Sequence, residues 1–177
     1  CSSDLGAVRR CDVLLVRQPP DQQDAQGWLM RHVTEAGLDL IKRFEGFSPT
    51  IYICPAGYPT IGYGHVVLAY EQDQFATGIT QAEATELLRK DVRIAERAVL
   101  RLISVPLTDG QLDALVSFTF SLGAGALQRS TLRRKVNGGE HESVPAELMK
   151  WVWADGKRLP GLVRRRRLES NFYRQIH

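Results

Sequence analysis

The chain has 177 residues, 44% of them hydrophobic and 8% aromatic, which is enough for one compact domain with its own core. No apolar run approaches the roughly 20 residues that a membrane-spanning helix needs, so the composition excludes such a span. The formal net charge of +3 is uneven along the chain, at −1 for residues 1–30, −2 for residues 31–130 and +6 for residues 131–177. A basic C-terminal part suggests contact with a polyanion, and an ordinary solvated helix face is the alternative.

The first thirty residues differ from the rest. They include the polar, proline-bearing stretch RQPPDQQDAQG, so we predict residues 1–30 to be an arm or linker, partly disordered, and residues 31–177 to be the folded domain. No export signal is visible in them. The three cysteines, Cys1, Cys11 and Cys54, lack metal-ligand spacing, and their odd number allows at most one disulfide within the chain. We expect no metal and no cofactor.

The domain begins with a helix and a small sheet. Thr34 is a good N-cap, apolar residues then recur three apart, and Gly46 stops the pattern, which predicts a short amphipathic helix ending at Glu45. Residues 46–67 are rich in β-branched and aromatic residues broken by glycine and proline, as is typical of an antiparallel hairpin sheet. The helix should therefore deliver its last side chain toward the sheet.

Beyond Thr80 the sequence predicts helices. Capping boxes at Thr80 with Glu83 and at Thr108 with Gln111 mark two helix starts. The first helix has one apolar stripe and stops before Pro106; the second, GQLDALVSFTFSLG, is apolar nearly all round and should form the centre of the core. Three shorter helices are predicted over 131–136, over 143–154 ending at Gly156, and from residue 160 onward.

These elements predict an α+β fold with two lobes, a small antiparallel hairpin sheet next to a mainly α-helical lobe. A cleft between two lobes is where substrates usually lie, and the segment from Glu45 to His65 would line it. A partly buried Glu is the usual proton donor in cleavage of glycosidic bonds, although a single Glu at a helix end is more often a solvated residue. No Asp or Glu lies between Glu45 and Glu71, so the second role would fall to Cys54, to Thr60, to a tyrosine or to a held water.

The spacing of Glu45, Cys54 and Thr60, followed by IGYGH, resembles the catalytic signature of the phage-type lysozymes, or endolysins, of glycoside hydrolase family 24. It is similar to the subgroup with Cys in place of the catalytic Asp. The resemblance continues through GLDLIKRFEG, LVSFTFSLGAGAL, STLRRKVNGG and KWVWADGKRLPGLVRRRRLESNFY, and covers about residues 31–177.

The resemblance implies a lysozyme-like fold and an endolysin or muramidase that hydrolyses the β-1,4 bond between N-acetylmuramic acid and N-acetylglucosamine in peptidoglycan. It implies that Glu45 is the general acid, that Cys54 takes the place of the family's Asp, and that Thr60 positions the attacking water or the sugar. Gly62 and Gly64 would let the strand backbone approach the substrate. It also implies that the protein acts on the cell wall in the host periplasm.

Three residues carry a structural or regulatory expectation. His65 is expected to form a structural pair with Asp91 on the long helix, as in the family pattern. Cys54 can act as a base toward water or as a nucleophile, or can simply be a buried small hydrophobe. A disulfide from Cys54 to Cys11 or Cys1 would block its chemistry, which makes a redox switch a further hypothesis.

The basic run Arg164 to Arg167 covers all faces of a helical turn, so at least one arginine should pack against or pair with the domain. The others could make transient contact with the anionic envelope. Trp151 and Trp153 are expected first as packing residues, and the alternative is that one of them borders the sugar cleft. We expect a monomer with peptidoglycan as its partner and no nucleic acid.

Two other functions stay open on the sequence. A lytic transglycosylase, giving anhydro-muropeptides, needs only the acid. A non-catalytic cell-wall or nucleic-acid binding protein would agree with the basic C-terminal part, but no base-reading motif is present.

Overall fold

The structure, a computed structural model, describes residues 31–175. The predicted arm over residues 1–30 therefore lies outside the described residues, as do Cys1 and Cys11 and any disulfide from them to Cys54. Between residues 31 and 175, no helix is both long enough and apolar enough to pass through a membrane.

Helix α2 (Glu35–Glu45) has the predicted bounds. The side chain of Thr34 accepts a hydrogen bond from the backbone N–H of Gly37, 3.1 Å away, which satisfies one of the free donors of the first turn. At the other end Gly46 adopts φ +71°, a conformation that suits glycine, and turns the chain toward the sheet. Glu45 is therefore the last helical residue before the sheet begins.

The sheet is three-stranded and antiparallel in the order β1-β2-β3, formed by β1 (Ser48–Ile53), β2 (Pro59–Gly62) and β3 (His65–Val66). Thr60 of β2 pairs with Tyr52 on one side and with Val66 on the other. This confirms the predicted hairpin sheet.

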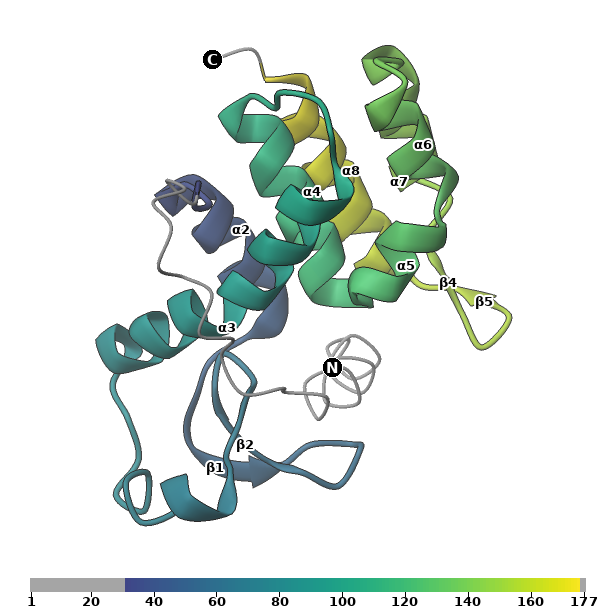
Figure 1. Ribbon diagram of the computed structural model, residues 1–177. Coiled ribbons are helices and arrows are strands. Elements are labelled where there is room, and N and C mark those ends of the chain that lie inside the picture. Colours follow the sequence, from purple (N-terminus) through teal and green to yellow (C-terminus); the bar gives the residue numbers. More distant parts are fainter. Residues whose placement is uncertain (1–30, 176–177) are drawn as a thin grey trace.

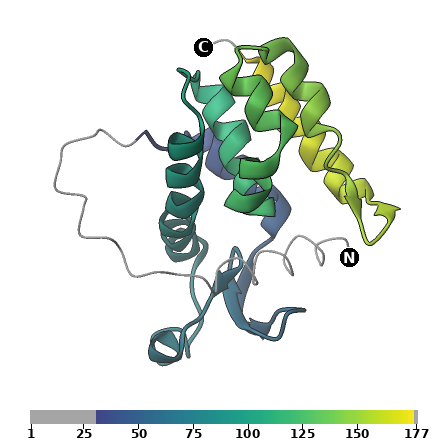
Figure 2. The same cartoon turned by 45° about the vertical axis from the view of Figure 1, so that its right-hand side comes forward.

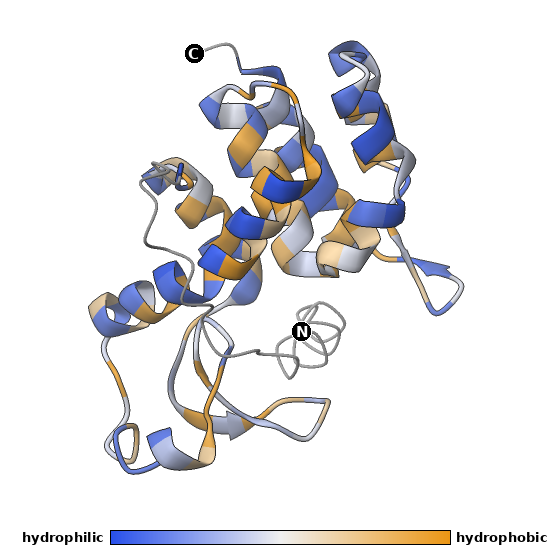
Figure 3. Ribbon diagram, in the orientation of Figure 1, coloured by the Kyte–Doolittle hydropathy of each residue, from blue (hydrophilic) through white to orange (hydrophobic). Residues whose placement is uncertain are grey.

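Helices α3 (Gln81–Leu102) and α4 (Asp109–Leu122) carry the core, and both predicted capping boxes are present. Every residue of α4 from Leu112 to Ser121 is buried, and α4 contacts α2, α3, α5 and α8. In Figure 3, α3 alternates between hydrophobic and hydrophilic segments along its length, as a helix with one buried stripe does. The helical lobe is thus built around α4.

The C-terminal part differs from the prediction in two places. The remaining elements are α5 (Ala124–Arg129), α6 (Thr131–Asn137), η2 (His141–Ser143), α7 (Val144–Leu148), β4 (Trp153–Ala154), β5 (Lys157–Arg158) and α8 (Pro160–Arg174). Helix α5 was not predicted. The helix predicted over 143–154 is wrong beyond residue 148, because Asp155 and Gly156, at φ +49° and +72°, form the turn of a tight hairpin between β4 and β5.

The two lobes lie at different ends of α3. Figure 1 places β1 and β2 below the main group of helices, and Figure 2, turned by 45°, shows the same separation with α3 extending from the sheet side to the helices. The α+β two-lobed fold is therefore confirmed. The helix α2 runs into the sheet, so Glu45 lies at the junction of the lobes.

Candidate active site

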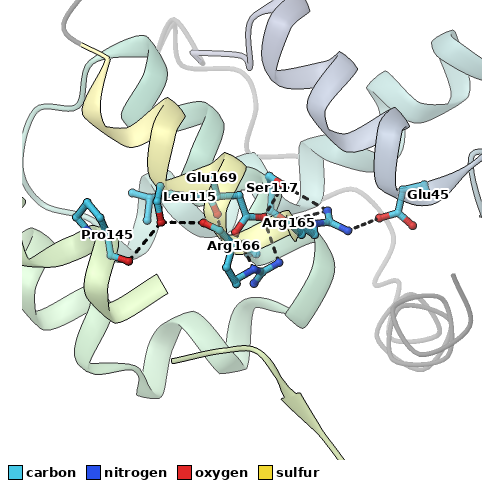
Figure 4. A network of polar contacts seen from close by, with 9 residues as sticks. Glu45, Leu115, Ser117, Pro145, Arg165, Arg166 and Glu169 are labelled. Atoms are coloured by element: carbon cyan, nitrogen blue, oxygen red, sulfur yellow. Dashed lines mark hydrogen bonds and ion pairs between the residues drawn. The ribbon is translucent and has the colours of Figure 1, made fainter. Parts of the chain in front are cut away.

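Glu45 lies where α2 ends and the chain enters β1, and its side chain is only 6% exposed. The guanidinium of Arg165, from α8, reaches it: Arg165 Nη1 donates to Glu45 Oε1 at 3.0 Å. Arg165 is itself buried and lies over the ring of Phe44, 5.4 Å from its centroid. The carboxylate is thus held by a buried cation from the opposite end of the chain (Figure 4).

The other donors of Arg165 are held by α4 and by α8 itself. Its Nη2 donates to the backbone oxygen of Ser117 at 3.2 Å and to the Ser117 hydroxyl at 3.3 Å, and its Nε donates to Glu169 Oε1 at 3.3 Å. The Ser117 hydroxyl in turn donates to Glu169 Oε1 at 2.7 Å. Figure 4 shows Arg165 between Glu45 on one side and this group on the other, so the guanidinium has little freedom to move.

Arg166 completes a set of two arginines and two carboxylates. It is fully buried, its Nη2 donates to Glu169 Oε1 at 3.1 Å, and its Nε lies 2.9 Å from Glu169 Oε2. Burial lowers the pKa of Arg166 to about 10, opposed by the nearby carboxylate of Glu169, so the guanidinium is still charged at neutral pH. Its guanidinium carbon also lies 5.1 Å from the centroid of the Phe118 ring. The expectation that at least one arginine of the run pairs with the domain is confirmed for two of them.

Cys54 follows β1 directly and opens the turn to β2. Its backbone N–H donates to the carbonyl of Tyr58 at 2.9 Å, and its own carbonyl accepts from Gly57 at 2.8 Å. The residue is 2% exposed and forms a small cluster with Val66, against which Ala56 and Tyr58 pack. To act on a sugar or on water, the thiol must become accessible from this buried position.

Thr60 lies in the middle of β2 and is 1% exposed. Its hydroxyl donates to the carbonyl of Tyr58 at 3.0 Å, a contact within its own strand region that fixes the side-chain rotamer. The structure therefore brings Thr60 and Cys54 together on one hairpin, both next to Tyr58. The catalytic roles of both residues stay predictions.

The backbone conformations at the two glycines predicted to contact substrate explain why glycine occupies these positions. Gly62 adopts φ +63°, and a Cβ there would lie 3.0 Å from Cβ of Ala84 and 3.1 Å from Cδ1 of Ile79. The missing side chain thus lets β2 pack closely on α3. Gly64 adopts φ +83° in the turn between β2 and β3. Contact of either glycine with substrate stays a prediction.

His65 is held between two acids. Its Nδ1 lies 2.9 Å from Asp91 Oδ2 on α3, the residue expected to pair with it, and both side chains are buried. Its Nε2 lies 3.4 Å from Glu71 Oε2, which also accepts the backbone N–H of Leu68. The ring packs edge-on against Phe75, with centroids 5.9 Å apart. This histidine ties the sheet to α3 and to the loop that follows β3.

Sequence reasoning missed the residues that hold Glu45. It placed one arginine of the run against the domain, but it did not connect Arg165 with Glu45, 120 positions away, or with Ser117 and Glu169.

Trp153 was expected to pack but is 60% exposed, because it belongs to the β4-β5 hairpin. Trp151 does pack, edge-on against Phe118 with centroids 5.3 Å apart.

Comparisons with known proteins show which family the chain resembles. The family model described as "Phage lysozyme" matches residues 42–169. The chain is 41% identical over 146 residues to an endolysin of Acyrthosiphon pisum secondary endosymbiont phage 1, covering 80% of this chain and 97% of that protein. It is 35% identical over 114 residues to a SAR-endolysin of Escherichia phage Mu, covering 64% of each. Among solved structures, the muramidase domain of SpmX from Asticaccaulis excentricus superposes with a TM-score of 0.72 at 34% identity, over 82% of this chain and 100% of that one.

Proposed function

Because the chain belongs to the phage lysozyme family, we propose that it is an endolysin that cleaves peptidoglycan with Glu45 as the general acid. The bond concerned is the β-1,4 bond between N-acetylmuramic acid and N-acetylglucosamine. The observation that carries the proposal is the position of the Glu45 carboxyl, nearly buried where α2 meets the sheet and fixed by a hydrogen bond of 3.0 Å from Arg165. A general acid must be held in a fixed position, and this contact restricts the carboxyl group of Glu45.

The first chemical step is proton transfer. Glu45, in its protonated form, donates its proton to the glycosidic oxygen while the bond from that oxygen to the anomeric carbon breaks. The contact from Arg165 Nη1 lies on Glu45 Oε1, one of the two oxygens of this carboxyl group. Glu45 has to regain a proton before the next turnover.

The second step, attack on the anomeric carbon, is assigned to Cys54 and Thr60 of the β1-β2 hairpin. In one version Cys54, as a thiolate, takes a proton from a water that Thr60 positions, and this water attacks the anomeric carbon with inversion. In the other, Cys54 Sγ attacks that carbon itself, and water, activated by Glu45, then releases the sugar with retention. The burial of Cys54 and Thr60 requires the substrate to displace what covers them in either version.

Turnover of purified peptidoglycan by variants tests the assignment. Glu45→Gln removes the proton and is expected to reduce turnover by at least about 100-fold, the usual contribution of a positioned acid. The matched control is Glu35→Gln, on the exposed first turn of the same helix, which should leave turnover unchanged. Full turnover by Glu45→Gln would overturn the proposal.

The same assay tests Cys54. Cys54→Asp should keep turnover if a negative charge is what this position supplies, whereas Cys54→Ser should lose it, since a serine hydroxyl is not ionised at neutral pH. Equal activity of both variants would make Cys54 a packing residue. Mass spectrometry of the products must show new reducing ends; anhydro-muropeptides would establish a lytic transglycosylase instead.

We also propose where the reaction takes place. Endolysins act on the cell wall, and we place this chain there, in the host periplasm, with peptidoglycan as its partner. A SAR-endolysin among its relatives supports export. Comparing lysis with and without reductant tests the hypothesis of a Cys54 disulfide, because only a disulfide-blocked protein gains activity on reduction.

A further inference from the structure

A second charged site lies on the outer side of α8, apart from Glu45. Four arginines surround a cavity of about 430 Å³: Arg43 from the last turn of α2, Arg158 from β5, and Arg164 and Arg167 from α8. We call it the arginine pocket. Its remaining lining is apolar and includes Val163 and Leu168, and no Asp or Glu lines it.

These arginines are not used to stabilise the fold. In contrast to Arg165 and Arg166, which are buried against carboxylates, all four side chains of the pocket belong to exposed residues. Within residues 31–175, none of the four guanidinium groups has a carboxylate at ion-pair distance or any other polar partner. Like charges brought together from three elements repel one another, so the arrangement costs stability unless an anion occupies the pocket.

The backbone next to the pocket also favours an anion. Helix α8 begins at Pro160, which lines the pocket, and its N-cap residue makes no side-chain hydrogen bond to the first turn. The first turn contains no acidic residue either. The partial positive charge of this helix end therefore adds to that of the guanidinium groups.

We propose that the arginine pocket binds a phosphate-bearing anion. A guanidinium pairs with two oxygens at once, and a tetrahedral phosphate presents oxygens to several arginines together, whereas a planar carboxylate has only two. Four cations and an apolar floor fit a ligand with more than one negative charge that is attached to an organic group. Neither Glu45 nor any residue of the three-stranded sheet β1-β2-β3 lines the pocket, so this inference is independent of the proposed catalysis.

Calorimetric titration of the full chain with sodium pyrophosphate, at about 0.15 M salt to screen weak surface attraction, tests the proposal. Saturable binding to one site is expected. Arg164→Gln with Arg167→Gln should weaken it at least about tenfold, or about 1.4 kcal/mol. The matched control, Arg93→Gln with Arg101→Gln, removes two exposed charges from α3 and should leave binding nearly unchanged.

Three results would overturn the proposal: no saturable binding, an equal loss in the control variant, or citrate binding as tightly as pyrophosphate, which would identify a carboxylate site. Vesicles of phosphatidylglycerol, compared with phosphatidylcholine, identify the source of the phosphate. Arginine-dependent binding that pyrophosphate displaces would identify a lipid headgroup, and pyrophosphate binding without vesicle binding would identify a soluble or glycan-borne phosphate. Peptidoglycan turnover by the pocket variant should equal that of the parent, which separates this site from Glu45.

Discussion

Replacing Arg165 tests how the molecule holds its proposed catalytic acid. In Arg165→Met the apolar stem is kept, but Glu45 loses its 3.0 Å hydrogen bond and Ser117 loses two. Glu169 keeps Arg166 and the hydroxyl of Ser117. Breaking a buried pair usually costs about 3–5 kcal/mol, and because one carboxylate stays paired we expect the lower end, about 3 kcal/mol of unfolding free energy.

A double-mutant cycle separates the contact with Glu45 from the rest. Glu45→Gln removes the charge that Arg165→Met leaves behind, so the double variant should be about 1–3 kcal/mol more stable than the sum of the single changes predicts. Urea unfolding followed by circular dichroism gives the four free energies. Arg167→Met, an exposed arginine two residues later in α8, is the control and should change stability by less than about 0.5 kcal/mol.

Two results would refute this reasoning. Additive effects, within about 0.5 kcal/mol, would mean that Arg165 and Glu45 are not coupled in solution. A loss for Arg167→Met as large as that for Arg165→Met would mean that the loss reflects helix α8 in general. Arg165→Lys gives an intermediate test, because a lysine keeps the charge but cannot reach Glu45, Glu169 and Ser117 with one planar group.

Two further predictions concern the scaffold. Gly62→Ala should lower the free energy of unfolding, measured with urea, by about 1–3 kcal/mol more than Gly57→Ala does. Both glycines have positive φ, but only at Gly62 would an added Cβ lie 3.0 Å from Cβ of Ala84. Equal losses in the two variants would disprove close packing of β2 on α3. Burial raises the pKa of Asp113 above its ordinary value of 3.8, against the lowering effect of its hydrogen bonds from Thr34. A raised folded pKa gives stability that is complete below the unfolded pKa and is lost as pH rises through the folded one. The advantage of the parent over Asp113→Asn should therefore shrink as pH rises above the ordinary pKa of 3.8, and a growing advantage would contradict this.

Local signals predicted most of the fold. The caps at Thr34, Thr80 and Thr108 act within three residues, so a sequence shows both partners at once, and the structure has all three helix starts. The hairpin at Asp155 and Gly156 shows the limit of this reasoning. Glycine both ends helices and forms tight turns, and the residues around Gly156 do not distinguish these two uses; in the structure the turn joins β4 to β5.

The candidate site was predictable only in part, for a related reason. The positions of Glu45, Cys54 and Thr60 follow from a helix end and a hairpin that are close in sequence. Glu45 is held by Arg165. Because the four residues of the run are identical, their sequence does not indicate which arginine faces inward.

That selection is made by tertiary packing. Successive residues of a helix point about 100° apart, so once α8 lies against α4, two of the four arginines must enter the core and two must face solvent. A buried guanidinium is tolerated only beside a carboxylate, and Glu169, on the same face of α8, supplies one. Glu45 supplies a second from α2. The basic run therefore divides into an inner pair, in which Arg165 holds Glu45 and Arg166 pairs with Glu169, and an outer pair that lines the arginine pocket. The two mutational tests address these halves separately.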